Sequence, residues 1–220
     1  MRTFREAFRR YKIQNRQKTR ARIINELIEK FKYKKYCEIG VMVSKHTFDK
    51  IKVDYKIGVD PGVAGFAEAT HLMTSDEFFE QNNENFDIVF IDGLHEGTQV
   101  YKDIVNSLDV LNEGGTIVCH DMNPLRELHQ RFPEPERPAN RPFAHNGDCW
   151  KAFVQLRMER DDLKMCVIDA DWGLGVIQKG SQKKIEETEL TYENFNKHRE
   201  SWLNLISEKE FFDKWVNENI

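Results

Sequence analysis

The feature that most constrains the fold of this chain is a series of short apolar runs, each with an acidic residue near its end, that alternate with helical segments. The runs are KKYCEIG (34–40), YKIGVDPG (55–62), FDIVFID (86–92) and the second half of NEGGTIVCHD (112–121). Strands that are apolar along their length and alternate with helices are typical of a parallel sheet covered on both faces. We therefore predict an α/β fold with a doubly wound, mostly parallel sheet.

The segments between and after these runs complete the predicted order of elements. Ser75 is placed to cap a helix, and THLM (70–73) is a weak candidate for a further strand. The runs at 165–169 and 174–180 are joined by a tight turn, which predicts an antiparallel last strand. Helical segments are predicted at 3–32, 47–51, 75–82, 98–111, 148–160 and 185–220.

The length of 220 residues suits one full-sized domain and is short for two. We predict a basic helical arm at 1–33, a main domain at 34–180 and a helical extension at 181–220. The stretch 122–147 holds five of the six prolines, and long loops inside compact domains are commonly functional. We predict that this stretch is a substrate loop, and that the aromatic-rich tail either caps the domain or forms a homo-oligomer surface.

Charge is distributed unevenly along the chain. Residues 1–35 carry 13 Lys and Arg against three Glu, a balance of +10, so the remainder carries −14 of the net −4. A basic segment on an acidic body could hold RNA, an anionic membrane surface or a phosphorylated substrate. We favour a simpler interpretation, in which this segment pairs with the protein's own acidic body, because it lacks an aromatic stacking platform.

The composition also restricts where the protein works. No apolar run approaches the roughly 18 residues that a membrane span needs, so an integral membrane protein is excluded. The first residues lack the apolar stretch of a signal peptide; an Arg-rich mitochondrial presequence is the alternative. Cys37, Cys119, Cys149 and Cys166 lie singly along the chain, which argues against a disulfide scaffold or a cysteine zinc site. We expect a cytoplasmic location.

Polar residues gather at the predicted carboxyl ends of the strands, where ligands bind in sheets of this kind. Five acidic strand ends in one sheet would repel one another. They are better explained by a cationic ligand, a hydroxyl-rich ligand or a metal. The residues concerned include Glu38, Asp60, Asp76, Asp92 and Asp121, with His95 and His120 beside the last two.

The spacing of two of these acids indicates a nucleoside ligand. Glu38 and Asp60 are 22 positions apart, and an acid at the end of a second strand is placed to bind ribose hydroxyls. The turn after Gly40 does not read GxGxxG, however, so a pyrophosphate could not approach the backbone closely. This disfavours a nicotinamide dehydrogenase and favours a nucleoside without phosphates, such as adenosine carrying a sulfonium.

The segments that hold these residues resemble the motifs of a known family. CEIGVMVSKHTF (37–48) and IGVDPG (57–62) resemble the first two motifs of class I S-adenosylmethionine-dependent methyltransferases. TSDEFF (74–79), FDIVFIDGLHEGTQVYKDI (86–104) and GGTIVCHDMNP (114–124) resemble, in order and spacing, small enzymes related to macrolide-type sugar O-methyltransferases. The likeness implies a Rossmann-like methyltransferase fold and S-adenosylmethionine (SAM) as cofactor.

The resemblance also implies roles for individual residues. Asp60 would hold the ribose and Asp92 would lie under the reacting centre. In metal-dependent members, acids corresponding to Asp92 and Asp121 hold magnesium, and His120 stands where some members have a second acid. Magnesium prefers oxygen ligands, whereas manganese also accepts an imidazole. The implied cofactor site comprises Glu38, Gly40, Val41, Ser44, Thr47, Asp60, Ser75, Asp76 and Asp92.

The expected chemistry is methyl transfer to an oxygen of a sugar or glycan. A sugar hydroxyl is a weak nucleophile at neutral pH, and a histidine or a metal can activate it. We assign His95 as general base, with Asp92 and His120 as further catalytic residues. Asp148 and Trp150 start a helix that would face the crevice and could hold a sugar ring.

Two other functions remain open from the sequence. The basic arm keeps a nucleic-acid methyltransferase in consideration, although Asn123-Pro124 matches the amino-methylating motif (D/N)PP(Y/F) only in part and follows the wrong strand. A non-catalytic partner protein with a cofactor-binding fold is the second alternative. The acids and the histidine at the strand ends argue against a decayed site.

Overall fold

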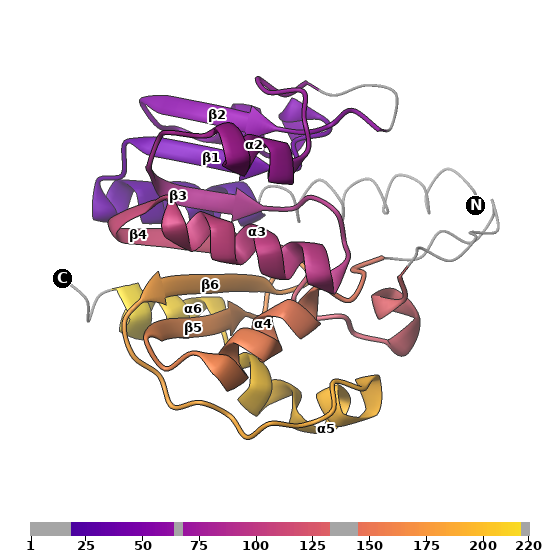
Figure 1. Cartoon of the computed structure of the whole chain (residues 1–220). Helices are drawn as coiled ribbons and strands as arrows, with labels where there is room; N and C mark the ends of the chain where they lie inside the picture. The colour runs from indigo at the N-terminus through magenta and orange to yellow at the C-terminus, as the bar shows by residue number, and fades with distance from the viewer. Residues whose placement is uncertain (1–18, 64–67, 133–144, 217–220) are drawn as a thin grey trace, which may run out of the picture.

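The computed structural model describes residues 19–63, 68–132 and 145–216 and contains one seven-stranded sheet within them (Figure 1). The strand order across the sheet is β2-β1-β3-β4-β6-β5-β7. The strands are β1 (Lys35–Ile39), β2 (Tyr55–Val59), β3 (Phe86–Ile91), β4 (Leu111–Cys119), β5 (Leu163–Ile168), β6 (Leu174–Lys179) and β7 (Leu205–Ile206).

The directions of the strands confirm the predicted fold. β1 pairs in parallel with β2 and β3, and β3 with β4, whereas β6 is antiparallel to both β4 and β5. The register aligns the ends of the parallel strands: Ile39 lies opposite Val59 and Ile91, and Ile91 opposite Cys119. The next residue of each strand therefore sits at the same edge of the sheet.

Helices cover both faces of the sheet, as the alternation of side chains along the buried strands requires. One face packs against α3 (Gly97–Asp109) and α4 (Cys149–Glu159), with α2 (Ser75–Gln81) and α5 (Tyr192–Leu203) also contributing buried side chains. The other face packs against the helix whose described residues are 19–31 and against the π-helical segment η4 (Phe211–Val216). In Figure 1, α3 and α4 lie in front of the sheet and the helix at 19–31 lies behind it.

The described part of the N-terminal segment is an integral layer of the fold. Ile23, Ile24 and Leu27 are fully buried against the sheet face that carries Tyr36 and Phe90. These apolar positions recur at the spacing of one helix face. They direct the first described turn of the helix, where Arg20 lies, toward the carboxyl edge of the strands.

Several sequence predictions need correction. THLM (70–73) forms an isolated bridge between Val59 and His71, and no further strand there. Thr74, and not Ser75, is the N-cap of α2, because its side chain accepts from the amide of Glu77 in a capping box. The tail from 185 on was predicted to be helical throughout, yet 185–191 hold no helix and 205–206 form β7 beside β5. The predictions for 3–18, 133–144 and 217–220 fall outside the described residues.

Shorter helices complete the described chain. They are the 3-10 helices η1 (Ser44–His46), η2 (Phe48–Lys50) and η3 (Glu127–Gln130), and the one-turn α6 (Glu208–Glu210). None of the helices in the described ranges has the length and apolar character that crossing a bilayer requires.

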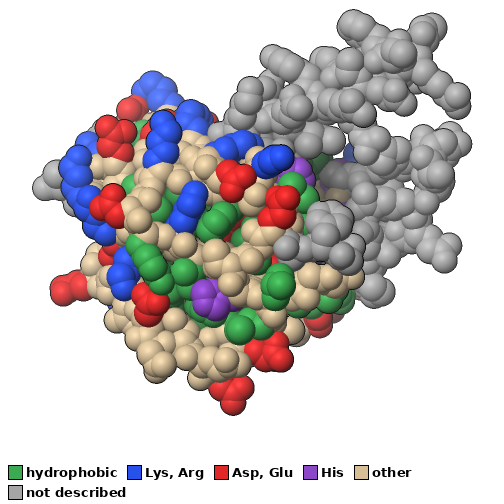
Figure 2. All heavy atoms as spheres, turned by 90° about the horizontal axis from the view of Figure 1, so that it is seen from above, with side chains coloured by type: hydrophobic (Ala, Val, Ile, Leu, Met, Phe, Trp, Pro, Cys, Tyr) green, Lys and Arg blue, Asp and Glu red, His purple; other side chains and the backbone are tan. Residues whose placement is uncertain are grey.

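Charges are mixed on the face above β2 and α2. Figure 2 shows Lys and Arg side chains there interspersed with Asp and Glu. Two of the ion pairs in this part of the molecule join Lys34 to Asp54 at 2.9 Å and Lys35 to Glu84 at 3.0 Å. This face therefore does not present one sign of charge to a partner.

Candidate active site

The aligned strand ends bring the residues after β1, β2, β3 and β4 together. The amide of Gly40 donates to the carbonyl oxygen of Val59 at 2.8 Å, and that of Asp92 to Ile39 at 2.8 Å. Gly40 has φ +91°, and a Cβ at this position would lie 2.2 Å from the carbonyl oxygen of Asp92. Only glycine fits a backbone so close to its neighbour.

His95 contacts two carboxylates at this edge. Its Nε2 lies 3.5 Å from Asp92 Oδ1 and 3.4 Å from Asp121 Oδ2. The His95 side chain is 27% exposed, whereas that of Asp121 is buried. His95, Asp92 and Asp121 were predicted to lie at this edge, and in the structure they are within reach of one another.

His120 lies on the same carboxylates but deeper in the protein. Its Nδ1 is 3.1 Å from Asp92 Oδ1 and 3.1 Å from Asp121 Oδ2, and its Nε2 is 3.7 Å from Asp171 Oδ1. The side chain is 5% exposed. Because His120 is enclosed by carboxylates and has little access to solvent, it is placed to orient them.

An arginine that was not among the predicted site residues completes the cluster. Arg20 Nη1 donates to Asp92 Oδ2 at 2.6 Å, and its Nε donates to Asp171 Oδ2 at 2.7 Å. Asp171, on the β5–β6 turn, was also missed. Asn146 was missed as well, and its amide donates to Asp121 Oδ1 at 2.6 Å.

These contacts determine the protonation of the cluster. Burial favours a neutral Asp92, but His120 and Arg20 outweigh burial and hold the pKa of Asp92 well below its usual range. Burial is likewise outweighed at Asp171, whose pKa His120 and Arg20 lower to about 2. Burial lowers the pKa of His95, yet the hydrogen bond to Asp92 and the charge of Asp121 raise it above its ordinary value.

Backbone strain is concentrated at this edge. Asp121 has φ +65°, Asp171 +46° and Trp172 +68°, and Met42 in the loop after β1 has +45°. Non-glycine residues in this conformation cost about 1 kcal/mol or more each and cluster at functional sites. The strain at Asp121 and Asp171 is consistent with a functional role for these two side chains.

The predicted cofactor residues fall into two groups. Glu38, Gly40, Val41, Thr47, Asp60 and Asp92 follow or end β1, β2 and β3, or line the loop after β1. The Asp60 carboxylate accepts from the amides of Met42 and Gly62, both at 2.8 Å, so it holds the loop after β1 against the loop after β2.

The second group is engaged elsewhere in the protein. The Ser44 hydroxyl bonds to Glu68 Oε2 at 2.8 Å and Asp49 Oδ2 at 2.9 Å. Ser75 and Asp76 accept from the Gln99 amide of α3, at 3.2 and 2.9 Å. In these contacts, the three side chains join neighbouring segments of the protein to one another.

Trp150 cannot hold a sugar ring, because it is fully buried. It packs on Phe195 at 4.3 Å between ring centroids and on Trp202 at 6.3 Å. Asp148 instead accepts from the amide of Gly97 at 2.7 Å and so joins α4 to α3.

Glu38 is a buried carboxyl that accepts from the Tyr36 hydroxyl at 2.5 Å. It is 2% exposed. Burial raises the pKa of Glu38 to about 8, despite the hydrogen bond from Tyr36. At neutral pH the folded protein therefore keeps Glu38 mostly protonated, which an unfolded chain would not.

This difference predicts how stability depends on pH. The folded state binds one more proton than the unfolded state between the usual glutamate pKa near 4.5 and the folded value of about 8. Stability from Glu38 is thus present below the lower value and is lost as the pH rises toward 8. The wild-type protein should lose roughly 2–5 kcal/mol of unfolding free energy across this range because Glu38 ionises. Glu38→Gln cannot ionise and should not show this loss.

Urea unfolding of both proteins at pH 5.5, 7 and 8.5 measures the effect, with the exposed Glu113→Gln as control. The Glu38→Gln protein should gain stability relative to wild type as the pH rises, and the control should not. Equal slopes in all three proteins would show that Glu38 is ionised in the fold.

The donor set at the site fits a divalent ion. Asp92, His95 and Asp121 each offer one ligand atom, and among the described residues these atoms lie within 4.8 Å of one another. Two carboxylate oxygens and one imidazole nitrogen suit an ion such as manganese better than magnesium. Arg20 and Asn146 bond the outer carboxylate oxygens, as residues around metal ligands commonly do.

A family model described as a methyltransferase domain matches residues 43–122. None of the curated proteins matches the chain.

Solved structures share the fold at low sequence identity. The O-methyltransferase TomG from Streptomyces achromogenes, involved in tomaymycin synthesis and solved with SAM, is 13% identical with a TM-score of 0.50, over 74% of this chain and 80% of that chain. A methyltransferase of Podospora anserina bound to S-adenosylhomocysteine (SAH) is 14% identical with a TM-score of 0.50, over 74% and 78%.

A third structure, from Klebsiella pneumoniae and described as a candidate O-methyltransferase, is 12% identical with a TM-score of 0.51, over 77% and 89%. Identities this low establish the fold alone. The shared fold and the family-model match together support a class I methyltransferase.

Proposed function

We propose that this protein transfers the methyl group of SAM to a hydroxyl oxygen of a sugar or glycan. The observation that carries the proposal is the position of His95 Nε2, 3.5 Å from Asp92 and 3.4 Å from Asp121, at the strand edge where such folds bind ligands. The descriptions of the Streptomyces and Klebsiella structures as O-methyltransferases add support for oxygen as the acceptor atom.

In this mechanism the oxygen of the acceptor hydroxyl attacks the methyl carbon of the sulfonium, and His95 accepts the proton that the hydroxyl loses. The carbon–sulfur bond breaks as the oxygen–carbon bond forms, which leaves a methyl ether, SAH and protonated His95. Asp92 and Asp121 stabilise the imidazolium, because both carboxylates face it. We assign the proton to His95 and not to His120 because the His95 side chain is 27% exposed and that of His120 only 5%.

Asp92 and Asp121 would also hold a divalent ion, with His95 as the third donor of the group. Such an ion, when bound, would lower the pKa of a hydroxyl that contacts it. His95 could not ligate the ion and take up the proton through the same Nε2, so it serves as the base when this nitrogen is left free of the ion. The protein's own contribution is the fixed geometry of the carboxylate pair, which Arg20, His120 and Asn146 maintain.

The cofactor would lie along the ends of β1 and β2. We propose that Glu38 and Gly40 frame its methionine part and that Asp60 binds the ribose. Ser75 and Asp76 lie at the start of α2 and would contact the adenine if their bonds to Gln99 opened. The loop at 122–147 remains our candidate for the substrate loop, although its centre lies outside the described residues.

Calorimetric titration with SAM and SAH, with and without magnesium or manganese, tests the cofactor. We expect binding at micromolar levels. Asp60→Asn should weaken it at least 10-fold, since the variant loses the charge that would accept both ribose hydroxyls and weakens the bonds to Met42 and Gly62. The exposed Asp109→Asn, at the end of α3, is the control. Absence of binding under every condition would contradict the proposal.

A nucleic-acid methyltransferase is the alternative function. The described residues on the face in Figure 2 carry charges of both signs, so that face offers no uniformly basic surface to a nucleic acid. A steep fall of RNA or DNA affinity with salt would favour the alternative.

A further inference from the structure

We propose that Arg20 is a positioning residue of this reaction centre: it holds the Asp92 carboxylate in the orientation in which Oδ1 faces His95. The inference rests on the proposed function for the role of His95. It adds a residue outside the stretch that matches the family model, which begins at residue 43.

The contacts form a closed ring of opposite charges. Arg20 bonds Asp92 through Nη1 and Asp171 through Nε and Nη2, the last at 3.3 Å. His120 bonds the other oxygen of Asp92, and its Nε2 lies 3.7 Å from Asp171 Oδ1, the oxygen that Arg20 Nη2 also contacts. Asp92 therefore has one oxygen fixed by Arg20, while its second oxygen meets both histidines.

The guanidinium shape is what allows this arrangement. Three nitrogens of Arg20 donate in different directions to two carboxylates on separate elements, which a lysine ammonium could not do with the same geometry. Arg20 is 9% exposed and the Asp171 side chain is fully buried. Removing one partner of such a buried network leaves an unpaired charge, so the remaining side chains must rearrange.

The helix that carries Arg20 is itself fixed. Ile23, Ile24 and Leu27 are fully buried against the sheet, so the helix cannot shift to relax the ion pairs. If the guanidinium is removed, the side chain of Asp92, Asp171 or His120 must then move. Among these three side chains we consider Asp92 because it contacts His95. This contact connects the helix that carries Arg20 to the proposed base.

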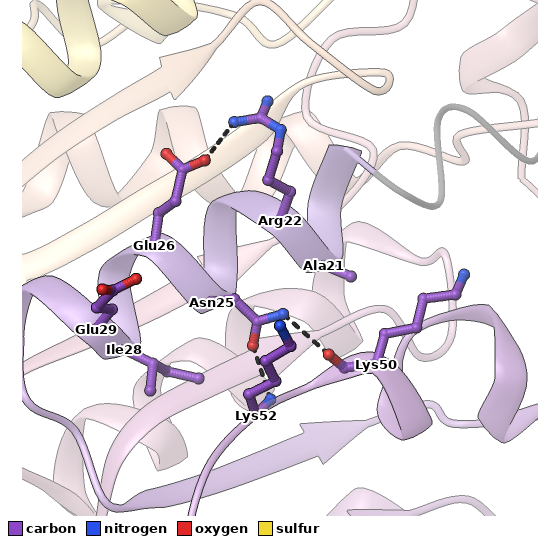
Figure 3. Close-up of a pocket in the computed structure, with 8 residues that line it drawn as sticks. All are labelled: Ala21, Arg22, Asn25, Glu26, Ile28, Glu29, Lys50 and Lys52. Carbon is purple, nitrogen blue, oxygen red and sulfur yellow. Dashed lines mark hydrogen bonds and ion pairs between the residues drawn. The ribbon is translucent and has the colours of Figure 1, made fainter.

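A purely structural ion pair is the competing explanation, and the same helix offers a control. Arg22 pairs with Glu26 and with Glu208, both at 2.7 Å, but all three side chains are more than one third exposed. Arg22 and Glu26 line a cavity of about 530 Å³. Figure 3 shows them there together with Asn25, whose side chain bonds the backbone of Lys50 and Lys52. None of the residues lining this cavity belongs to the cluster around Asp92.

The experiment compares full-length Arg20→Gln, Arg20→Lys and Arg22→Gln with wild type. Crystal structures provide a readout that needs no activity. In Arg20→Gln we expect the Asp92 carboxylate to rotate away, so that its nearest oxygen lies more than 4 Å from His95 Nε2. Arg22→Gln should leave Asp92 in place. An unmoved Asp92 in Arg20→Gln would overturn the inference even if methyl transfer were never observed.

Kinetics provide the second readout. Arg20→Gln should lower kcat about 100-fold while the KM for the acceptor and the SAH affinity change less than threefold, and Arg20→Lys should restore part of the rate. Loss of thermal stability with unchanged kcat would assign Arg20 a structural role only. If Arg20→Gln does not fold, Arg20→Lys and Asp171→Asn, which weaken the ring from either side, replace it in both readouts.

Discussion

Replacing His95 by alanine should lower turnover by about 10²- to 10⁴-fold, the range that a positioned general base contributes. The variant loses the imidazole that faces Asp92 Oδ1 and Asp121 Oδ2 at 3.5 and 3.4 Å. The SAH affinity should stay within a factor of three, because His95 is not one of the proposed cofactor contacts. Single-turnover methyl transfer and calorimetry measure the two quantities separately.

The exposed His198 of α5 supplies the control, since it stacks on Trp202 far along the chain from the strand-end residues. His198→Ala should retain the wild-type rate. A rate in His95→Ala that matched the control would remove His95 from proton transfer. The hydroxyl would then have to be activated by another group.

Gly40→Ala should cost about 3 kcal/mol of stability or more and should abolish cofactor binding. Two effects combine at this position. A residue with a Cβ is strained at φ +91°, and the added carbon would lie 2.2 Å from the Asp92 carbonyl oxygen and 2.5 Å from Gly93 Cα. The strain costs about 1–2 kcal/mol and overpacking of a tight contact about 1–3 kcal/mol.

Gly114→Ala separates these effects. Gly114 also has a positive φ, +72°, but a Cβ there would meet no atom within 4 Å. Gly114→Ala should therefore lose only the stability that backbone strain costs. Urea unfolding of the two variants gives the difference, and equal losses would show that the chain after β3 can move away from Gly40.

The sequence could predict the sheet and the residues at its edge for a physical reason. Each parallel strand is buried on both faces, so its apolar run and its polar end are visible in the sequence, and the register then brings Asp60, Asp92 and His120 to one level. The glycine turns and the spacing between the strands also indicate where each strand ends. These features depend on short stretches of chain.

Arg20 and Asp171 could not be predicted in this way. Arg20 lies in a basic segment with many similar residues, and its partner lies 151 positions away in a turn. Trp150 was misassigned for a related reason. Its burial depends on Phe195 and Trp202 of α5, whose packing over α4 no local pattern predicts.

The separation of Arg20 from Asp171 has a consequence for how the protein is made. During synthesis Arg20 leaves the ribosome 151 residues before Asp171. Until then the guanidinium and the Asp92 carboxylate lack the partner that completes their ring. Contacts of such long range form late in folding, and domains of this size often pass through partly folded states. The fold can therefore gather its central strands during synthesis, while the reaction centre becomes complete only after the β5–β6 turn has been added.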